Sequence, residues 1–242
     1  MNKLTGKTAI VTGGGSGIGE GIARALAAEG VNVVICGRRE AALARVAEGI
    51  RVADGNVHTE TADVSRQEDA ERVVAAALEH FGAIHVLVNN AGIGGWGHIH
   101  DYDVAAWDQV MAVNLRGPFL MSRAVLPHMR RQREGDILNI SSESGIEYYE
   151  SDGGYGLSKH ALNALAEYIQ RENQAHGIRV NTICPGMVVT EMSQDTPGLD
   201  HDRCLYPEDI ADLAMWLLTR RANIKIGTPI LIQTMLNPWE NA

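Results

Sequence analysis

The sequence predicts an α/β fold in which helices cover both faces of a doubly wound parallel sheet of about seven strands. Short runs rich in β-branched residues alternate with longer amphipathic stretches along the 242 residues. The short runs are apolar on both faces, as in Ile137-Leu138-Asn139-Ile140. Such strands are typical of a sheet buried between helices, and right-handed crossovers make the sheet parallel. A single domain over residues 1–242 is expected.

The expected elements alternate in chain order. The strands are Thr8–Thr12, Asn32–Cys36, Val57–Thr61, Val86–Asn89, Asp136–Ile140, Arg179–Cys184 and Pro229–Ile232. The helices between them are Ile18–Glu29, Glu40–Ala53, Gln67–Phe81, Val104–Arg131, Gly154–His176 and Pro207–Thr219. The long irregular stretch from about 190 to 206 follows a strand end, where substrate lids are commonly found.

Composition excludes several classes of protein. Hydrophobic residues make up 45% of the chain, enough for one sizeable core, and no apolar run is long enough for a membrane span or signal peptide. The net charge of −9 disfavours nucleic acid and anionic membranes as partners. Three cysteines without CxxC spacing favour a reducing compartment, so a cytoplasmic protein is expected. His98 and His100 are expected to be surface residues, because no set of metal-ligand spacings surrounds them.

A glycine-rich turn follows the first predicted strand and opens the first helix. It reads Thr12-Gly13-Gly14-Gly15-Ser16-Gly17-Ile18-Gly19. Glycines let the backbone approach a pyrophosphate, and the helix N-terminus offers free N–H groups. A P-loop is excluded because no Gly-Lys-Ser/Thr follows. The turn therefore predicts a Rossmann-type dinucleotide site, with a merely flexible turn as the alternative.

The end of the second strand predicts which dinucleotide binds. NAD-specific proteins place an acidic residue there for the ribose 2′-hydroxyl, whereas an arginine accommodates a 2′-phosphate. Here Cys36-Gly37-Arg38-Arg39 offers no carboxylate and two guanidinium groups. NADP(H) is therefore preferred, with NAD(H) as the alternative if both arginines simply begin the next helix in solvent.

A candidate catalytic group follows the fifth predicted strand. Tyr155 and Lys159 are four residues apart and share one helix face, and a nearby ammonium favours phenolate. Ser142 ends the fifth strand at the ligand-binding edge, and Asn114 is a polar residue in an apolar helix segment. Taken singly, each residue has an alternative. Tyr155 and Lys159 could be an exposed pair, Ser142 a helix-cap or turn residue, and Asn114 a satisfied core amide.

With these motifs the sequence resembles the short-chain dehydrogenase/reductase family over nearly the whole chain. The motifs, in family order, are the Thr12–Gly19 turn, Asp63-Val64, Asn89-Asn90-Ala91-Gly92, Asn114, Ser142, Tyr155-x-x-x-Lys159, and Pro185-Gly186 followed by Thr190. The resemblance implies an NAD(P)-dependent oxidoreductase that interconverts a carbonyl and an alcohol.

The resemblance also implies roles for the catalytic residues. Tyr155 would exchange a proton with the substrate oxygen, and Ser142 would orient that oxygen. Lys159 would hold the nicotinamide ribose and lower the pKa of Tyr155, and Asn114 would support Lys159 through a water.

The resemblance further implies which residues bind the coenzyme. Asp63 would contact the adenine amino group, Asn90 would lie beside the adenosine ribose, and Val188 and Thr190 would hold the nicotinamide carboxamide. The expected coenzyme-binding residues are Gly13, Gly15, Ser16, Gly17, Ile18, Gly19, Arg38, Arg39, Asp63, Val64, Asn90, Ala91, Gly92, Tyr155, Lys159, Pro185, Gly186, Val188 and Thr190.

The substrate and the partners are less sharply indicated. Trp96, Ser144, Tyr149, Met187 and Met192 are expected to line the substrate pocket, and aromatic and Met side chains favour a small apolar or ring-bearing carbonyl or alcohol. Two alternatives are a 3-oxoacyl-acyl-carrier-protein reductase, which the Pro185–Met192 segment resembles, and an NAD-dependent polyol or secondary-alcohol dehydrogenase. A non-enzymatic nucleotide sensor would not need the Tyr155 and Lys159 pair. The family implies a homotetramer, or a homodimer, built by the Val104–Arg131 helix and the helix of Tyr155.

Overall fold

Parallel strands form one sheet within residues 3–221 and 223–239, which the computed structural model describes. The strands are β1 (Thr8–Thr12), β2 (Asn32–Gly37), β3 (Val57–Thr61), β4 (Val86–Asn89), β5 (Gly135–Ile140), β6 (Ile178–Pro185) and β7 (Ile230–Ile232). Their order in the sheet is β3-β2-β1-β4-β5-β6-β7, and every pairing is parallel. The direction of winding reverses between β1 and β4, which is where open α/β sheets bind ligands.

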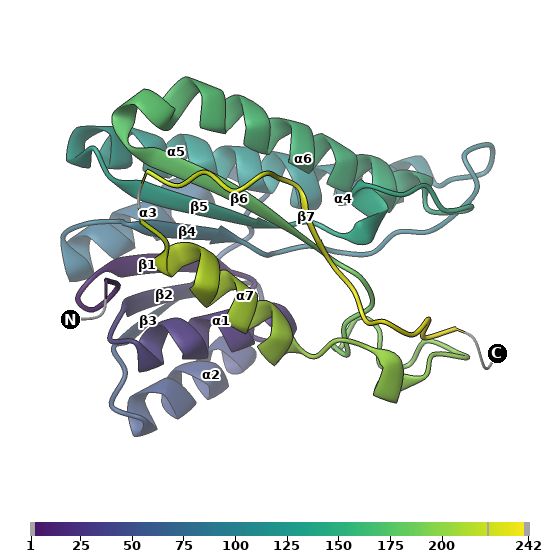
Figure 1. Ribbon diagram of the computed structural model, residues 1–242, viewed down its shortest axis with the longest axis horizontal. Helices are drawn as coiled ribbons and strands as arrows, with labels where there is room; N and C mark the ends of the chain where they lie inside the picture. The colour runs from purple at the N-terminus through teal and green to yellow at the C-terminus, as the bar shows by residue number, and fades with distance from the viewer. Residues whose placement is uncertain (1–2, 222, 240–242) are drawn as a thin grey trace.

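Helices cover both faces of this sheet, as predicted (Figure 1). They are α1 (Gly17–Ala28), α2 (Glu40–Val52), α3 (Gln67–Phe81), α4 (Val104–Met111), α5 (Gly117–Gln132), α6 (Gly153–Asn173) and α7 (Pro207–Thr219). One hydrophobic core lies under α1, α2 and α7, and a second lies under α3, α5 and α6. None of these helices is long and apolar enough to cross a membrane.

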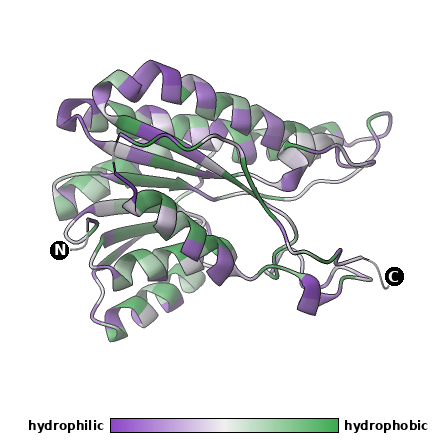
Figure 2. Ribbon diagram, viewed as in Figure 1, coloured by the Kyte–Doolittle hydropathy of each residue, from purple (hydrophilic) through white to green (hydrophobic). Residues whose placement is uncertain are grey.

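The burial of the strands explains why they could be predicted. Every residue of β1 and of β6 is buried, because helices cover both faces of the sheet. Such strands are mostly apolar on both faces, and this composition is visible in the sequence. Figure 2 shows the hydrophobic residues along the strands and on the inner helix faces, with hydrophilic residues facing outward. Three of the predicted strands have the observed ends, and the other four differ by one residue at one or both ends, within the usual uncertainty of element ends.

The long helix predicted over Val104–Arg131 is interrupted, and this prediction is corrected. After α4 the chain forms a π-helical turn at Ala112–Arg116 before α5 begins. Pro118 has no N–H to donate to the carbonyl of Asn114, four residues earlier, and the Gly117 N–H reaches back five residues to the Ala112 carbonyl instead. The turn therefore changes which backbone N–H and carbonyl groups are hydrogen-bonded to each other around Asn114.

An ion pair between a buried arginine and a partly buried aspartate joins β5 and β6 at the edge of the sheet opposite its carboxyl end. Asp136 and Arg179 are register partners, and Arg179 Nε donates to Asp136 Oδ1 over 2.6 Å. Arg179 is 5% exposed, and its other nitrogens donate to the carbonyls of Leu218 and Arg221.

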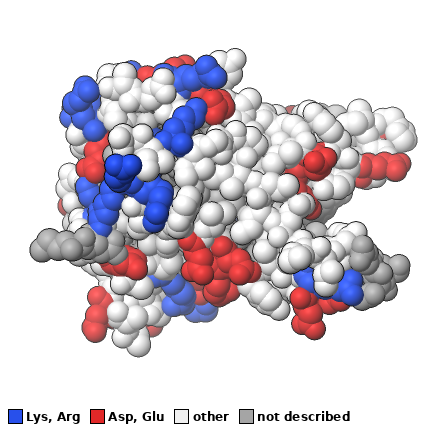
Figure 3. Space-filling model, viewed as in Figure 1, with Lys and Arg blue, Asp and Glu red and all other residues white. Residues whose placement is uncertain are grey.

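On the face in Figure 3, Lys and Arg side chains gather toward the side where the chain begins.

Candidate active site

A cleft of about 490 Å³ opens at the carboxyl edge of the sheet. Its walls come from the ends of β1, β2 and β4, from α6 and from the loop after β6. The structure brings most of the predicted coenzyme-binding residues to this cleft. Those that line it are Gly13, Gly15, Ser16, Gly17, Ile18, Arg38, Arg39, Asp63, Val64, Asn90, Ala91, Gly92, Tyr155, Lys159 and Thr190.

The glycine turn has the backbone geometry that a phosphate cradle needs. Gly13 and Gly17 adopt φ angles of +66° and +52°, which favour glycine. A Cβ on Gly13 would stand 2.8 Å from Asn90 Nδ2, so the turn packs against the end of β4 without room for a side chain. Ser16 precedes α1 in an extended conformation and makes no side-chain cap. The first N–H groups of α1 are thus left for an anion in the cleft.

Two arginines follow β2 at the other side of this turn. Arg39 Nη2 donates to Ser16 Oγ over 2.8 Å and lies 2.7 Å from Glu191 Oε2. Arg38 is exposed in the cleft wall, and no described side chain pairs with it. The tip of β2 carries no carboxylate, so Arg38 offers an unpaired guanidinium where a ribose 2′-substituent would lie.

Asp63 and Asn90 are each held by local hydrogen bonds. Asp63 Oδ1 accepts from the backbone N–H of Ser65 over 3.0 Å and from its hydroxyl over 2.7 Å. Asn90 Nδ2 donates to the Thr12 carbonyl over 2.9 Å. Both residues are therefore fixed in the cleft wall before any ligand arrives.

The catalytic candidates meet at the opposite end of the cleft. Lys159 is 4% exposed, and its Nζ donates to the Ile140 carbonyl over 3.0 Å. Nζ also lies 5.4 Å from the centre of the Tyr155 ring. Ser142 follows β5, its Oγ accepts from the Ser144 N–H over 3.2 Å, and its hydroxyl acts to lower the pKa of Tyr155. Three groups from two elements thus converge at one place.

The pKa of Tyr155 moves in the opposite direction to the one expected from the sequence. Burial raises the pKa of Tyr155 to about 12; the Ser142 hydrogen bond opposes this, and the carboxylates of Asp152 and Glu143 reinforce it. Burial also lowers the pKa of Lys159 to about 8. Tyr155 therefore holds its proton firmly at neutral pH.

Asn114 ties the π-helical turn to two neighbouring segments. Its Oδ1 accepts from the Ile93 N–H over 2.9 Å, and its Nδ2 donates to the Ile93 carbonyl over 2.9 Å and to Ser158 Oγ over 3.0 Å. Its amide is satisfied, as in the core-amide alternative. Ser158 precedes Lys159 on α6, so Asn114 helps to fix the segment that carries the lysine.

The lowered pKa of Lys159 predicts a pH-dependent stability. Between the folded pKa of about 8 and the ordinary value of 10.5, the unfolded chain binds the proton that folded Lys159 does not. The free energy of unfolding should therefore rise with pH across this window. Denaturant unfolding at pH 8 and pH 10, at the two ends of about that range, should show wild type gaining stability relative to Lys159→Met.

The control for this measurement is Lys225→Met, which changes an exposed lysine. Its stability should follow that of wild type between the two pH values. Parallel curves for wild type and Lys159→Met would contradict the lowered pKa.

Several predicted residues do not line the cleft. They are Ser142, Asn114, Gly19, Pro185, Gly186 and Val188. Gly19 packs against the Gly13 carbonyl, so its role is close packing of α1 on the turn. Val188 is buried and forms a bridge with Leu205 at the end of the segment predicted as a lid.

Of the residues predicted to line the substrate pocket, Met192 lines the cleft; Trp96, Ser144, Tyr149 and Met187 do not. Ser144 is buried, and the Met187 carbonyl accepts from the Leu205 N–H. Trp96 is 65% exposed, yet its ring centre lies 6.2 Å from that of Tyr155, so it still flanks the candidate catalytic group.

The sequence places Glu191 in the predicted lid but does not indicate its contact with the arginines after β2. Glu191 lines the cleft beside Thr190, together with apolar residues such as Ile93 and Val113. The adjoining Thr190 motif marked the segment, but the direction of the glutamate side chain depends on how the loop folds back.

Comparison with known proteins agrees with the fold and the motifs. Residues 7–198 match the short chain dehydrogenase family. The chain is 39% identical over 230 residues to an uncharacterized oxidoreductase of Staphylococcus saprophyticus, covering 94% of this chain and 97% of that one.

Two solved structures are also similar. An alcohol dehydrogenase from the archaeon Thermococcus sibiricus, complexed with 5-hydroxy-NADP, has a TM-score of 0.87 and 29% identity, covering 95% of this chain and 97% of that one. A metagenomic short-chain oxidoreductase in complex with NADP has a TM-score of 0.85 and 34% identity, covering 96% and 99%. The chain therefore belongs to the short-chain dehydrogenase family of oxidoreductases.

Proposed function

We propose that this protein is an NADP(H)-dependent oxidoreductase that transfers a hydride between the nicotinamide and a small carbonyl or secondary-alcohol substrate. One observation carries the proposal. Tyr155 and Lys159 line one end of a single cleft, and the glycine turn and two arginines line the other. This arrangement accommodates the two ends of a dinucleotide.

The residues of the cleft fit the coenzyme. The uncapped start of α1 and the glycine turn would hold the pyrophosphate, and Arg38 would meet the 2′-phosphate. Asp63 and Asn90 would position the adenosine, and Thr190 the carboxamide end. The bound coenzyme would supply or accept the hydride, and the protein would supply orientation and a proton. The NADP complexes of two similar structures support this choice over NAD(H).

The protonated state of Tyr155 suits reduction of a carbonyl. A phenol with a pKa of about 12 carries its proton at neutral pH and can donate it to an oxygen that gains negative charge. Ser142, whose hydroxyl acts to lower the pKa of Tyr155, would orient the same oxygen. Lys159 would hold the nicotinamide ribose, and Asn114 would support Lys159 through α6 and a bound water.

The surroundings of Tyr155 favour a small, apolar or ring-bearing substrate. Met192 lines the cleft, and Trp96 stands beside the Tyr155 ring. The similar structure of an alcohol dehydrogenase supports an alcohol as one side of the reaction. The segment at about 190–206 would then act as the substrate lid of a single catalytic domain.

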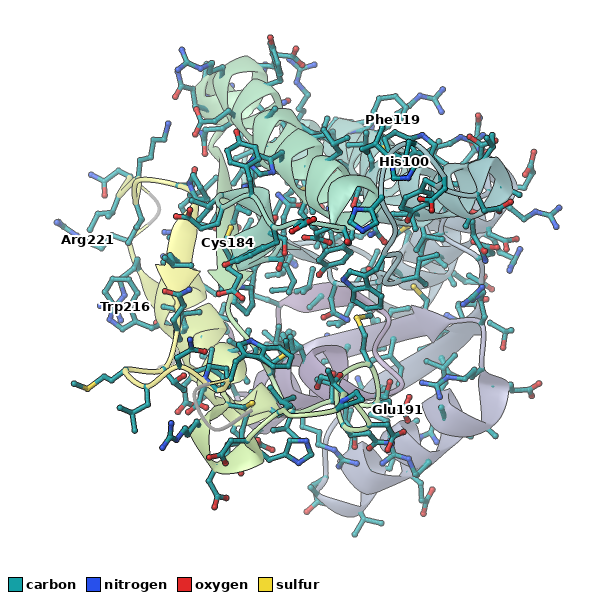
Figure 4. The ribbon with its side chains drawn as sticks, turned by 90° about the vertical axis from the view of Figure 1, so that its right-hand side faces the viewer. His100, Phe119, Cys184, Glu191, Trp216 and Arg221 are labelled. Carbon is teal, nitrogen blue, oxygen red and sulfur yellow. The ribbon has the colours of Figure 1, made fainter. Side chains whose placement is uncertain are left out.

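We also propose a homotetrameric, cytoplasmic protein that binds neither nucleic acid nor membranes. Phe119 on α5, which Figure 4 labels, and Leu157 on α6 are 47% and 50% exposed, so these helices offer apolar surface to a second subunit. All three cysteines are free and buried, which suits a reducing compartment. The net charge of −9 disfavours polyanionic partners.

Arg38→Ala tests the coenzyme assignment. Losing a charged hydrogen bond to the 2′-phosphate should weaken NADPH binding by about 1–3 kcal/mol and leave NADH binding nearly unchanged. Titration by protein fluorescence measures both affinities. Equal losses for the two coenzymes would show that Arg38 does not meet the 2′-phosphate.

A further inference from the structure

The loop after β6 crosses the cleft and contacts Arg39, one of the two arginines that follow β2. Glu191 Oε2 lies 2.7 Å from Arg39 Nη2, and the same nitrogen donates to Ser16 Oγ over 2.8 Å. A Cβ on Gly17 would stand 3.2 Å from Thr190 Cγ2, so the loop also packs on the glycine turn. Figure 4 labels Glu191 where this loop passes the N-terminal third of the chain. Three segments distant in sequence thus meet at Arg39.

The arginines near the tip of β2 differ in whether a carboxylate pairs with them. Arg39 is paired with Glu191, and Arg45 on α2 is paired with Glu20, whereas Arg38 has no partner among the described side chains. The hydrogen bond from Arg39 lowers the pKa of Glu191, so its carboxylate is ionised at neutral pH. One of the two cations available to a 2′-phosphate is therefore already engaged by an anion.

The Arg39–Glu191 pair is open to solvent. The side chains are 60% and 55% exposed, so the pair is weak enough for an anionic ligand to compete with it. A 2′-phosphate at the tip of β2 would meet Arg39 and, close behind it, the negative carboxylate. Adenosine without that phosphate would leave the pair untouched.

We propose that Glu191 is a specificity-determining residue for the coenzyme: by holding Arg39 across the cleft it weakens the discrimination in favour of the 2′-phosphate. The inference rests on the proposed function, since it assumes that the 2′-phosphate lies near Arg38 and Arg39. Glu191 acts on the coenzyme's adenosine end and takes no part in the proton transfer at Tyr155. Most of the preference for the 2′-phosphate then comes from Arg38. Arg39 contributes less to it, because Arg39 is paired with Glu191.

The test compares two ligands that differ only in the 2′-phosphate: adenosine 2′,5′-bisphosphate and adenosine 5′-monophosphate. Glu191→Gln should tighten binding of the bisphosphate roughly twofold to fivefold, the range of an exposed ion pair, and leave the monophosphate unchanged. Calorimetric titration of the whole protein gives both dissociation constants without any turnover. The gain should shrink at high salt, because the groups are exposed.

Two further variants localise the effect. Asp195→Asn removes an exposed carboxylate from the same loop that makes no contact with Arg39, and should leave both affinities unchanged. In an Arg39→Ala background, Glu191→Gln should no longer tighten the bisphosphate. A gain that persists without Arg39, or equals that of Asp195→Asn, would overturn the inference, as would equal tightening of both ligands or no tightening.

The inference and the proposed function can fail separately. If Arg38→Ala and Arg39→Ala leave bisphosphate binding unchanged, the 2′-phosphate does not bind here and the coenzyme assignment fails. If these variants weaken the bisphosphate but Glu191→Gln does not tighten it, the coenzyme assignment stands and the role of Glu191 is refuted.

Discussion

Replacing Tyr155 with phenylalanine should lower kcat by about 10²–10⁴-fold, the usual contribution of a positioned acid or base. The variant loses the phenolic hydroxyl and keeps the ring beside Trp96 and Lys159. Coenzyme affinity should therefore change little. Steady-state kinetics with a small ketone and NADPH, together with fluorescence titration of NADPH, separate the two effects.

Tyr168→Phe provides the matched control for this prediction. Tyr168 lies on the same helix, α6, but is 68% exposed and points away from the cleft. Its turnover should equal that of wild type. If Tyr155→Phe retains full activity, some other group donates the proton and the proposed role of Tyr155 is wrong.

Removing the Arg179 side chain should cost the fold about 3–5 kcal/mol, because Asp136, whose side chain is only 21% exposed, would lose its buried partner. Arg179 also satisfies the carbonyls of Leu218 and Arg221, so Arg179→Ala breaks contacts from β6 to both β5 and the end of α7. The free energy of unfolding from denaturant titration measures the loss.

Arg171→Ala serves as the comparison for Arg179→Ala. Its ion pair with Glu167 lies on the surface of α6, where the arginine side chain is 76% exposed, so a loss of about 0–1 kcal/mol is expected. Similar losses for the two variants would show that the Arg179 and Asp136 pair is not the stabilising contact that its burial suggests.

The sheet could be predicted because the apolar composition of its strands reflects their burial between two layers of helices. A run such as Ile137–Ile140 is apolar on both faces and is buried at every position. The glycine turn was equally predictable, because its positive φ angles at Gly13 and Gly17 need glycine. Local sequence suffices where the constraint is local.

The interruption of the long helix shows where periodicity fails. The apolar pattern continues through Asn114, so one helix was expected. Pro118 was the available signal, because it cannot donate to the carbonyl four residues before it. The π-helical turn that results places the Asn114 side chain against Ile93 and Ser158, which lie far away in sequence.

The electrostatics of the site depended on the whole fold. The spacing of Tyr155 and Lys159 placed both on one helix face but did not indicate how deeply the surrounding elements bury them, and burial dominates both pKa shifts. Glu191 reaches Arg39 only because the loop after β6 folds back over the glycine turn. No local pattern in the sequence encodes that contact.

Titration of the wild-type protein with NADPH and with NADH tests the central claim most directly, with the four Trp residues as reporters. Trp96 is well placed for this, since its ring centre lies 6.2 Å from that of Tyr155, where we propose that the nicotinamide binds. We predict tighter binding of NADPH, because Arg38 is free to meet the 2′-phosphate. Equal affinities, or tighter binding of NADH, would contradict the assignment of the protein as an NADP(H)-dependent enzyme.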